Sequence, residues 1–161
     1  LYLANVDENG LPDGGEAVAE LIAKSPGIEV VPVCAQVEAE VAELDPDDRI
    51  AFLKDYGLEK TGIDRLIVAA FRLLNLITFY TTVSGKLQAW QVSEGDTAPK
   101  AAGRIHTDME KGYIRAEVAA YCDVLEIGRI DGLKDVGKLR LEGRDYIVND
   151  GDIIRFLFKS D

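Results

Sequence analysis

The chain has 161 residues, of which 47% are hydrophobic and 29% are charged, and its formal net charge is −11 at pH 7. This balance is typical of a globular protein with one ordinary domain or two small ones, and it excludes a disordered chain. The longest apolar runs, such as residues 66–71, are far shorter than the roughly 20 residues of a membrane helix. The cysteines Cys34 and Cys122 lie far apart and have neither a disulfide-framework nor a metal-ligand spacing. We therefore expect a cytoplasmic protein with no membrane partner.

The charged residues are unevenly distributed along the chain. Residues 1–75 contain 6 Lys and Arg against 15 Asp and Glu, whereas residues 76–161 contain 12 against 14. This asymmetry favours two modules with different surfaces, of which the second is better suited to contact nucleic acid or a ribonucleoprotein. A solvated surface with chance clustering of charges explains the counts equally well.

The first part of the chain has the pattern of a strand, a helix and a second strand. The apolar residues 1–4 predict a buried strand, and apolar positions at helical spacing in residues 17–22 predict a helix that Pro26-Gly27 terminates. The β-branched run of residues 28–35 predicts the second strand. Elements in this order form a crossover between parallel strands, so the second strand should end beside the first, at the edge where open α/β sheets bind ligands.

Polar side chains follow the first strand directly, as Asn5-Val6-Asp7-Glu8. In P-loop nucleotidases, Asn-x-x-Asp at a strand end recognises the base, and a separate glycine-rich loop with Lys and Ser or Thr holds the phosphates. Asn5 and Glu8 are therefore candidate base-binding residues, although their spacing alone does not select adenine or guanine. The alternative interpretation is that both residues cap the following loop. No Gly-x-x-x-x-Gly-Lys-[Ser/Thr] occurs in the 161 residues.

Three further helices are expected before residue 76. They are a short helix with Val37, Val41 and Leu44 on one face, a helix that begins at Asp45-Pro46-Asp47, and a helix that Thr61 caps and Asn75 ends.

From residue 77 the apolar period changes to two. Residues 77–83 and 86–92, joined by Ser84-Gly85, predict a β-hairpin. Thr97-Ala98-Pro99 predicts the start of a helix that reaches His106. Further strands are expected at residues 113–119, 146–148 and 153–158. We therefore predict an α/β parallel sheet followed by a small α+β domain, in which a β-grasp sheet packs over one helix.

Two motifs point to a family. The first is the Asn-x-x-Glu of residues 5–8, and the more specific one is the block of residues 98–118, Ala-Pro-Lys-Ala-Ala-Gly-Arg-Ile-His-Thr-Asp-Met-Glu-Lys-Gly-Tyr-Ile-Arg-Ala-Glu-Val. The match continues through residues 146–154. Over essentially its whole length, the chain resembles the YchF subfamily of Obg-related P-loop NTPases.

The resemblance implies that residues 1–75 are the C-terminal part of a nucleotide-binding domain, with a partial P-loop NTPase sheet, and that residues 76–161 form a TGS domain, a ubiquitin-like β-grasp module. It implies hydrolysis of ATP in preference to GTP, with Mg²⁺, and association with the ribosome. Cys34 and Ala35 match the family's position for backbone contacts to the base. The phosphate loop, the Mg²⁺ ligand and the switch segments precede Leu1 in this family. We therefore expect the preceding part of the same protein to be a partner, and we expect this chain alone neither to hold nucleotide firmly nor to catalyse hydrolysis.

Other residues invite chemical interpretations that we consider weaker. His106 alternates with Asp108 and Glu110, which on a strand would place three metal ligands on one face. A fourth ligand is not apparent, so we expect His106 to hold a turn and predict no metal site. Trp90 and Tyr80 could stack on nucleic-acid bases, but aromatic residues in a small sheet more often belong to the core.

Two classes of function remain open. In the first, the chain is a piece of an ATPase that reads the base. In the second, the β-grasp domain docks onto the ribosome or RNA, with Lys100, Arg104, Lys111 and Arg115 as contact candidates, or it binds only proteins and never contacts RNA. In either case, the first half should expose strand edges and apolar faces and be the less stable half.

Overall fold

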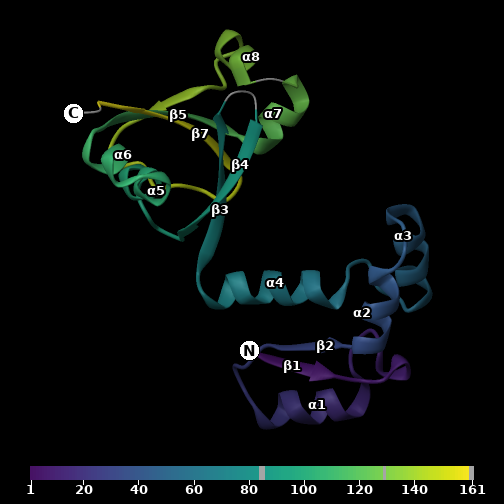
Figure 1. Cartoon of the computed structure of the whole chain (residues 1–161). Coiled ribbons are helices and arrows are strands. Elements are labelled where there is room, and N and C mark those ends of the chain that lie inside the picture. Colours follow the sequence, from purple (N-terminus) through teal and green to yellow (C-terminus); the bar gives the residue numbers. More distant parts are fainter. Residues whose placement is uncertain (84–85, 129, 160–161) are drawn as a thin grey trace. The chain divides into compact units, whose positions relative to one another are not determined.

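The structure is a computed structural model that describes residues 1–83, 86–128 and 130–159 of the chain (Figure 1). It divides into two compact units, Leu1–Leu74 and Asn75–Asp161. The Ser84-Gly85 turn predicted for the hairpin lies outside the described residues. Within the described ranges, no helix has both the length and the apolar composition needed to cross a membrane.

The first unit is built around two parallel strands, β1 (Tyr2–Asn5) and β2 (Val30–Val33), paired from Tyr2 opposite Val30 to Asn5 opposite Val33. The 3-10 turn η1 (Glu8–Gly10) and helix α1 (Gly15–Lys24) connect them. This arrangement confirms the predicted strand, helix and parallel strand. The two carboxyl ends therefore meet at one edge of the sheet.

Three helices follow β2, as the apolar spacing predicted. They are α2 (Ala35–Ala42), α3 (Pro46–Asp55) and α4 (Gly62–Leu73). The Thr61 hydroxyl caps α4 by accepting a hydrogen bond from the Asp64 N–H at 3.0 Å. Asn75, with φ of +50°, follows the end of α4 in the left-handed conformation that Asn tolerates better than most residues.

Strand β1 is not buried, contrary to the prediction from its apolar sequence. Tyr2 and Leu3 expose 44% and 53% of their surface, whereas Val31 and Val33 of β2 are buried against Ala69 of α4. The difference arises because the packing helices cover mainly β2 of a two-stranded sheet. Most other large apolar side chains that this unit exposes lie on or next to α4, in agreement with the expectation that the first half exposes apolar surface; the exposed residues are Ile22, Ile50, Ile63, Ile67, Val68, Leu73 and Leu74.

The second unit contains a five-stranded mixed sheet in the order β4-β3-β7-β5-β6. The strands are β3 (Leu76–Val83), β4 (Lys86–Ser93), β5 (Tyr113–Ala120), β6 (Arg140–Glu142) and β7 (Asp152–Phe158). The first and last strands, β3 and β7, are parallel neighbours, and all other pairs are antiparallel. This order is that of a β-grasp sheet, as predicted.

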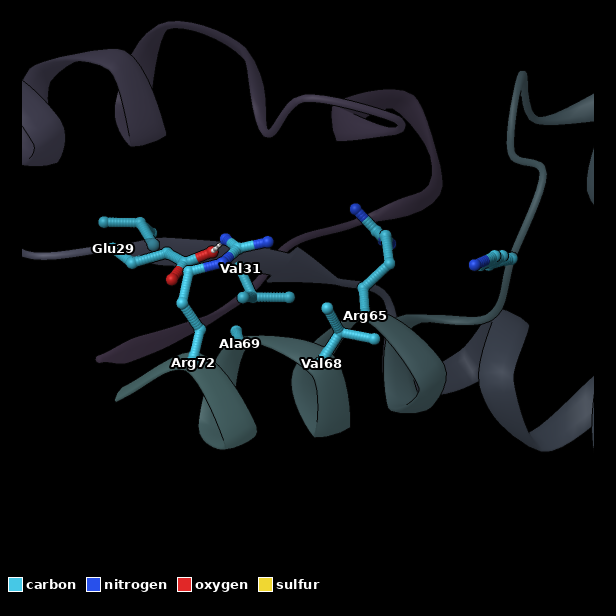
Figure 2. A pocket seen from close by; sticks show the side chains of 8 residues that line it. Glu29, Val31, Arg65, Val68, Ala69 and Arg72 are labelled. Carbon is cyan, nitrogen blue, oxygen red and sulfur yellow. Dashed lines mark hydrogen bonds and ion pairs between the residues drawn. The ribbon is translucent and has the colours of Figure 1, made fainter. Parts of the chain in front are cut away.

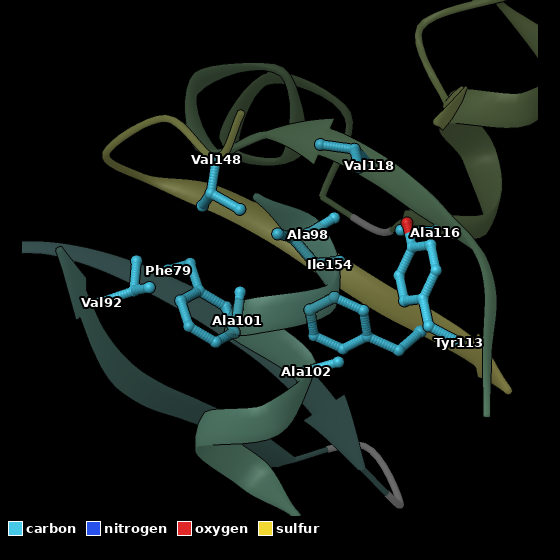
Figure 3. Packing of buried hydrophobic residues seen from close by; sticks show 11 residues of the cluster. Phe79, Val92, Ala98, Ala101, Ala102, Tyr113, Ala116, Val118, Val148 and Ile154 are labelled. Carbon is cyan, nitrogen blue, oxygen red and sulfur yellow. The ribbon is translucent and has the colours of Figure 1, made fainter. Parts of the chain in front are cut away.

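Helix α5 (Ala98–Ile105) covers one face of this sheet. Figure 3 shows its small residues Ala98, Ala101 and Ala102 among the side chains of the strands. The Phe79 and Phe156 rings lie at 87° to each other, 6.0 Å apart. Small residues on the helix let it approach the sheet closely, so that the core is tightly filled.

Residues 107–111 and 121–148 depart from the prediction. Helices α6 (Thr107–Lys111), α7 (Tyr121–Ile127) and α8 (Ile130–Asp135) were not expected, and neither was β6. The strand predicted at residues 146–148 is wrong, because only Ile147 forms a bridge, with Thr97. The Tyr146 hydroxyl instead donates a hydrogen bond to buried Asp152 at 2.6 Å, and this side-chain network holds the segment as a bend.

Candidate functional site

An open depression of about 450 Å³ lies where β1 and β2 end. Its lining residues come from the two segments that follow these strands: Asn5, Val6, Asp7, Glu8, Asn9, Cys34, Ala35 and Gln36. The structure therefore brings together all four residues considered for base binding. They are Asn5, Glu8, Cys34 and Ala35.

Asn5 ties the two sides of the depression together. Its Oδ1 accepts a hydrogen bond from the Ala35 N–H at 3.1 Å, across 30 positions of sequence. One residue further on, the Val6 N–H donates to the Val33 carbonyl at 2.8 Å. Because Ala35 is the first residue of α2, Asn5 also satisfies one of the backbone donors at the start of that helix. With Oδ1 engaged in this way, the Asn5 amide nitrogen supplies donors to the site.

The capping of the loop after β1 is done by Asp7. Its Oδ1 accepts a hydrogen bond from the Gly10 N–H at 3.0 Å, which closes the η1 turn. The side chain that caps this loop is therefore that of Asp7, whereas Asn5 bonds across to Ala35. Glu8 lies in η1 and is exposed, so its carboxylate is available as an acceptor.

The polarity of the depression defines the ligand chemistry that it suits. Its eight residues include two carboxylates and neither Lys nor Arg. Phosphate groups would be repelled by these carboxylates, whereas a ring with amino donors would be favoured by them. At the opposite side, Cys34 is buried and Ala35 is exposed and small, so a flat ligand can approach the backbone there.

Tyr56, at the end of α3, is a neighbour of this site that sequence reasoning missed. Its half-buried ring packs against the cluster that contains Cys34 and lies 5.4 Å from the Phe52 ring. Burial and the negative charges of Glu8 and Glu40 raise the pKa of Tyr56. No local sequence signal links Tyr56 to Glu8, because helix packing alone brings them near each other.

The four basic contact candidates do not form one patch. Lys100 and Arg104 of α5 line an open depression of about 480 Å³, where the Lys100 ammonium pairs with Asp96 at 3.0 Å. Arg115 precedes Ala116 on β5, and because Ala116 and Val118 lie in the core under α5, Arg115 points to the opposite face of the sheet. Lys111 ends α6.

His106, Trp90 and Tyr80 all make structural contacts within the second unit. The His106 Nδ1 accepts a hydrogen bond from the Asp108 N–H at 3.2 Å and starts α6, which confirms that His106 holds a turn. Its neighbours continue as a helix rather than a strand, and no cluster of three potential metal ligands occurs in the part of the chain that the structure describes. Trp90 packs against the core, and Tyr80 stacks on Tyr121 at 6.0 Å.

A further depression of about 350 Å³ lies beside α4 and β2 in the first unit (Figure 2). The two arginines in its lining, Arg65 and Arg72, both interact with residues of the β2 segment. Arg72 pairs with Glu29 at 2.7 Å, and the Arg65 Nη2 donates a hydrogen bond to the Pro32 carbonyl at 2.8 Å. These contacts fasten α4 to both ends of β2.

The fold and the site define an α/β protein whose first unit has an open depression at the carboxyl ends of two parallel strands and whose second unit is a β-grasp domain. Residues 76–159, more than half of the chain, match the family model YchF-GTPase_C, described as a protein of unknown function (DUF933). The chain therefore belongs to the YchF family, and it corresponds to the C-terminal portion of its relatives. This result confirms the resemblance seen in the sequence.

Curated relatives match nearly all of the chain. The "Ribosome-binding ATPase YchF" of Haemophilus influenzae is 51% identical over 160 residues, which are 98% of this chain and 44% of the relative. The protein of the same description from Bacillus subtilis is 44% identical, with 98% and 44% covered. The chain thus spans less than half the length of these relatives.

Solved structures of the same architecture agree with the fold. The Schizosaccharomyces pombe YchF GTPase superposes with a TM-score of 0.85 at 26% identity, covering 98% of this chain and 43% of that protein. A GTP binding protein from Pyrococcus horikoshii shares the fold, with a TM-score of 0.65 at 22% identity, covering 98% of this chain and 45% of that protein.

Proposed function

We propose that residues 1–75 carry the base-recognising part of the ATP- or GTP-binding site of a cytoplasmic, ribosome-binding NTPase. The observation that carries this proposal is the Asn5–Ala35 hydrogen bond, which joins the ends of β1 and β2 around one depression. The Asn5 amide and the Glu8 carboxylate then present a donor and an acceptor to the edge of the base. The Cys34-Ala35 backbone forms the opposite wall.

The chemistry of the depression supports base binding rather than phosphate binding. Adenine offers an exocyclic amino donor and guanine offers ring N–H and amino donors, and a carboxylate accepts from either. Phosphates are held by basic side chains and by helix N-terminal amides; this depression lies at the start of α2, but its eight residues include two carboxylates and no basic side chain to offset them. The phosphates and Mg²⁺ would therefore be held by the phosphate loop of the longer protein.

Titration of the chain with adenosine and with guanosine, followed by amide chemical shifts, tests this assignment. We expect shifts to concentrate in residues 5–9 and 34–36, with weak affinity, because phosphate contacts are missing. The Glu8→Ala variant should weaken binding, whereas Glu16→Ala, an exposed glutamate of α1, should not. Shifts that are absent or scattered over the surface would overturn the assignment.

We further propose that residues 76–161 are a TGS-type β-grasp module that docks the protein on the ribosome. The relatives' description as ribosome-binding supports this, as does the position of 12 of the 18 basic residues after residue 75. Since Asp96 already pairs with Lys100 and Arg115 faces away from α5, the contact should be made by only part of the candidate set.

Co-sedimentation with ribosomes over a range of salt concentrations tests the docking proposal. Each phosphate that a basic side chain neutralises contributes about 0.7 to the logarithmic salt slope on single strands. Lys100→Glu with Arg104→Glu should therefore weaken sedimentation and flatten the slope. Lys54→Glu, an exposed lysine of α3, is the matched control. Unchanged binding and slope would assign the module to a protein partner instead.

A further inference from the structure

Glu38, in the first turn of α2, links the candidate base site to the start of α4. We infer that Glu38 is a positioning residue of this site, through which base binding and the order of α4 are coupled; the ligand part of this inference rests on the proposed function. Glu38 Oε1 accepts a hydrogen bond from the Gly62 N–H at 2.6 Å, and Oε2 accepts from the Ile63 N–H at 3.3 Å. Gly62 and Ile63 are the first two residues of α4.

A short, hydrogen-bonded turn separates Glu38 from the site. The Ala35 N–H donates to Asn5 Oδ1 at 3.1 Å, and the Glu38 N–H donates to the Cys34 carbonyl at 3.0 Å. Both bonds therefore belong to the first turn of α2 and its cap. Because the backbone hydrogen bonds of a helix join each residue to the one four positions earlier, we expect a movement of the Cys34-Ala35 backbone to displace Glu38 as well.

Helix α4 is seated on the same end of β2 by direct contact. A Cβ on Gly62 would lie 2.7 Å from Val33 Cγ2 and 2.9 Å from Glu38 Oε1, so only glycine permits this approach. Arg65, one turn further along α4, donates to the Pro32 carbonyl at 2.8 Å. Figure 2 shows Arg65 extending from α4 beside β2. The start of α4 and the backbone around Cys34 therefore form one packed assembly.

The coupled helix α4 leads from the candidate site to the second unit. Helix α4 runs from Gly62 to Leu73, and the chain enters β3 at Leu76. A base that orders Cys34-Ala35 also orders the start of the helix from which the second unit continues. By linkage, disorder at the start of α4 must weaken base binding by the same factor.

Two caps of α4 allow a matched comparison. Glu38→Ala removes the cap that comes from α2, whereas Thr61→Ala removes the local cap on the Asp64 N–H. Both variants should loosen α4, by roughly three- to tenfold in amide exchange at Gly62 and Ile63. Of these two variants, only Glu38→Ala should also speed exchange of the Ala35 amide. Among variants of the base-site residues, only Asn5→Ala should speed exchange of the Gly62 amide.

The affinity of the same variants for adenosine tests whether Glu38 also affects ligand binding. Glu38→Ala should weaken binding by a factor similar to its effect on Ala35 exchange, Thr61→Ala should leave affinity unchanged, and Glu38→Gln, which keeps one acceptor oxygen, should fall between. If Glu38→Ala does not fold, Glu38→Gln carries the same comparison with Thr61→Ala. Equal effects of the Glu38 and Thr61 variants on the Ala35 amide would refute the coupling. Absence of adenosine binding would refute the proposed base site instead, and the exchange measurements would still decide the coupling.

Discussion

Replacement of Asp152 by alanine tests the polar network that closes the β-grasp unit. The Asp152 side chain is only 4% exposed, and its carboxylate accepts hydrogen bonds from the Tyr146 hydroxyl at 2.6 Å and the Asn149 N–H at 2.9 Å. Arg140 Nη2 lies 3.5 Å from the carboxylate and donates to the Tyr146 hydroxyl at 3.0 Å. Alanine would leave these donors without their shared acceptor.

The magnitude follows from the number of hydrogen bonds that the buried carboxylate accepts. Removing one member of a buried charged network costs about 3–5 kcal/mol, and a hydrogen bond to a charged group contributes about 1.5–3 kcal/mol. The Arg140 side chain is 46% exposed and can be hydrated, so the cost comes mainly from two hydrogen bonds. We expect Asp152→Ala to lower the free energy of unfolding by about 3–4 kcal/mol and Asp152→Asn by about 1–2 kcal/mol.

Urea unfolding followed by tryptophan fluorescence measures this effect. Trp90 is the single tryptophan of the chain and lies in β4, where its Nε1 donates to Thr81 Oγ1 at 3.0 Å, so its emission reports on the β-grasp unit. Asp145→Ala, at an exposed aspartate of the same connection, should stay within about 0.5 kcal/mol of the parent. Equal stabilities of the Asp152→Ala and Asp145→Ala variants would refute the reasoning.

Three further outcomes are expected. Burial raises the pKa of Tyr113 and Tyr146, the latter also through Asp152, so the contribution of these two tyrosines to the stability of the β-grasp unit should be constant below the unfolded pKa of about 10 and be lost as the pH rises through the folded pKa. Tyr146→Phe should make the resulting fall in stability shallower, and an unchanged fall would contradict the assignment. Amide exchange in residues 28–34 should be faster than in residues 153–158, because β2 has one neighbouring strand and β7 has two; equal or slower exchange in residues 28–34 would count against this. Finally, the chain should release no phosphate from Mg²⁺-ATP above a protein-free blank, since its sequence has no phosphate loop; turnover that survives repurification and disappears in Glu8→Ala would disprove this.

Much of the architecture was predictable where apolar spacing and turn residues agree. The parallel β1–β2 pair followed from the strand, helix and strand pattern, and the β3–β4 hairpin followed from period-two alternation. Residues 121–148 gave no such agreement, because short helices and the three-residue β6 are too brief to show a period. The apolar Tyr146-Ile147-Val148 resembles a strand, but only Ile147 forms a bridge, and Tyr146 and Asn149 donate hydrogen bonds to Asp152.

The candidate site was predictable only in part. Strand ends placed Asn5 beside Ala35, since parallel strands share an edge. Tyr56 and Glu38 could not be found in this way. Glu38 meets Gly62 across 24 positions, and Tyr56 approaches Glu8 through the packing of α3. Both contacts depend on how helices pack together, which a single sequence does not encode in any local pattern.

Because β3 pairs in parallel with β7, the sheet of the second unit can be completed only late in translation. Strand β3 leaves the ribosome first among the strands of the second unit, but its central neighbour β7 begins only at Asp152. The β3–β4 hairpin can therefore form early, while the middle of the sheet stays open until nearly all of the unit has been translated. During that interval, the β3 edge is available to chaperones or to aggregation. A nascent chain halted before Asp152 should consequently remain sensitive to protease in β5, and one released after Phe158 should become resistant.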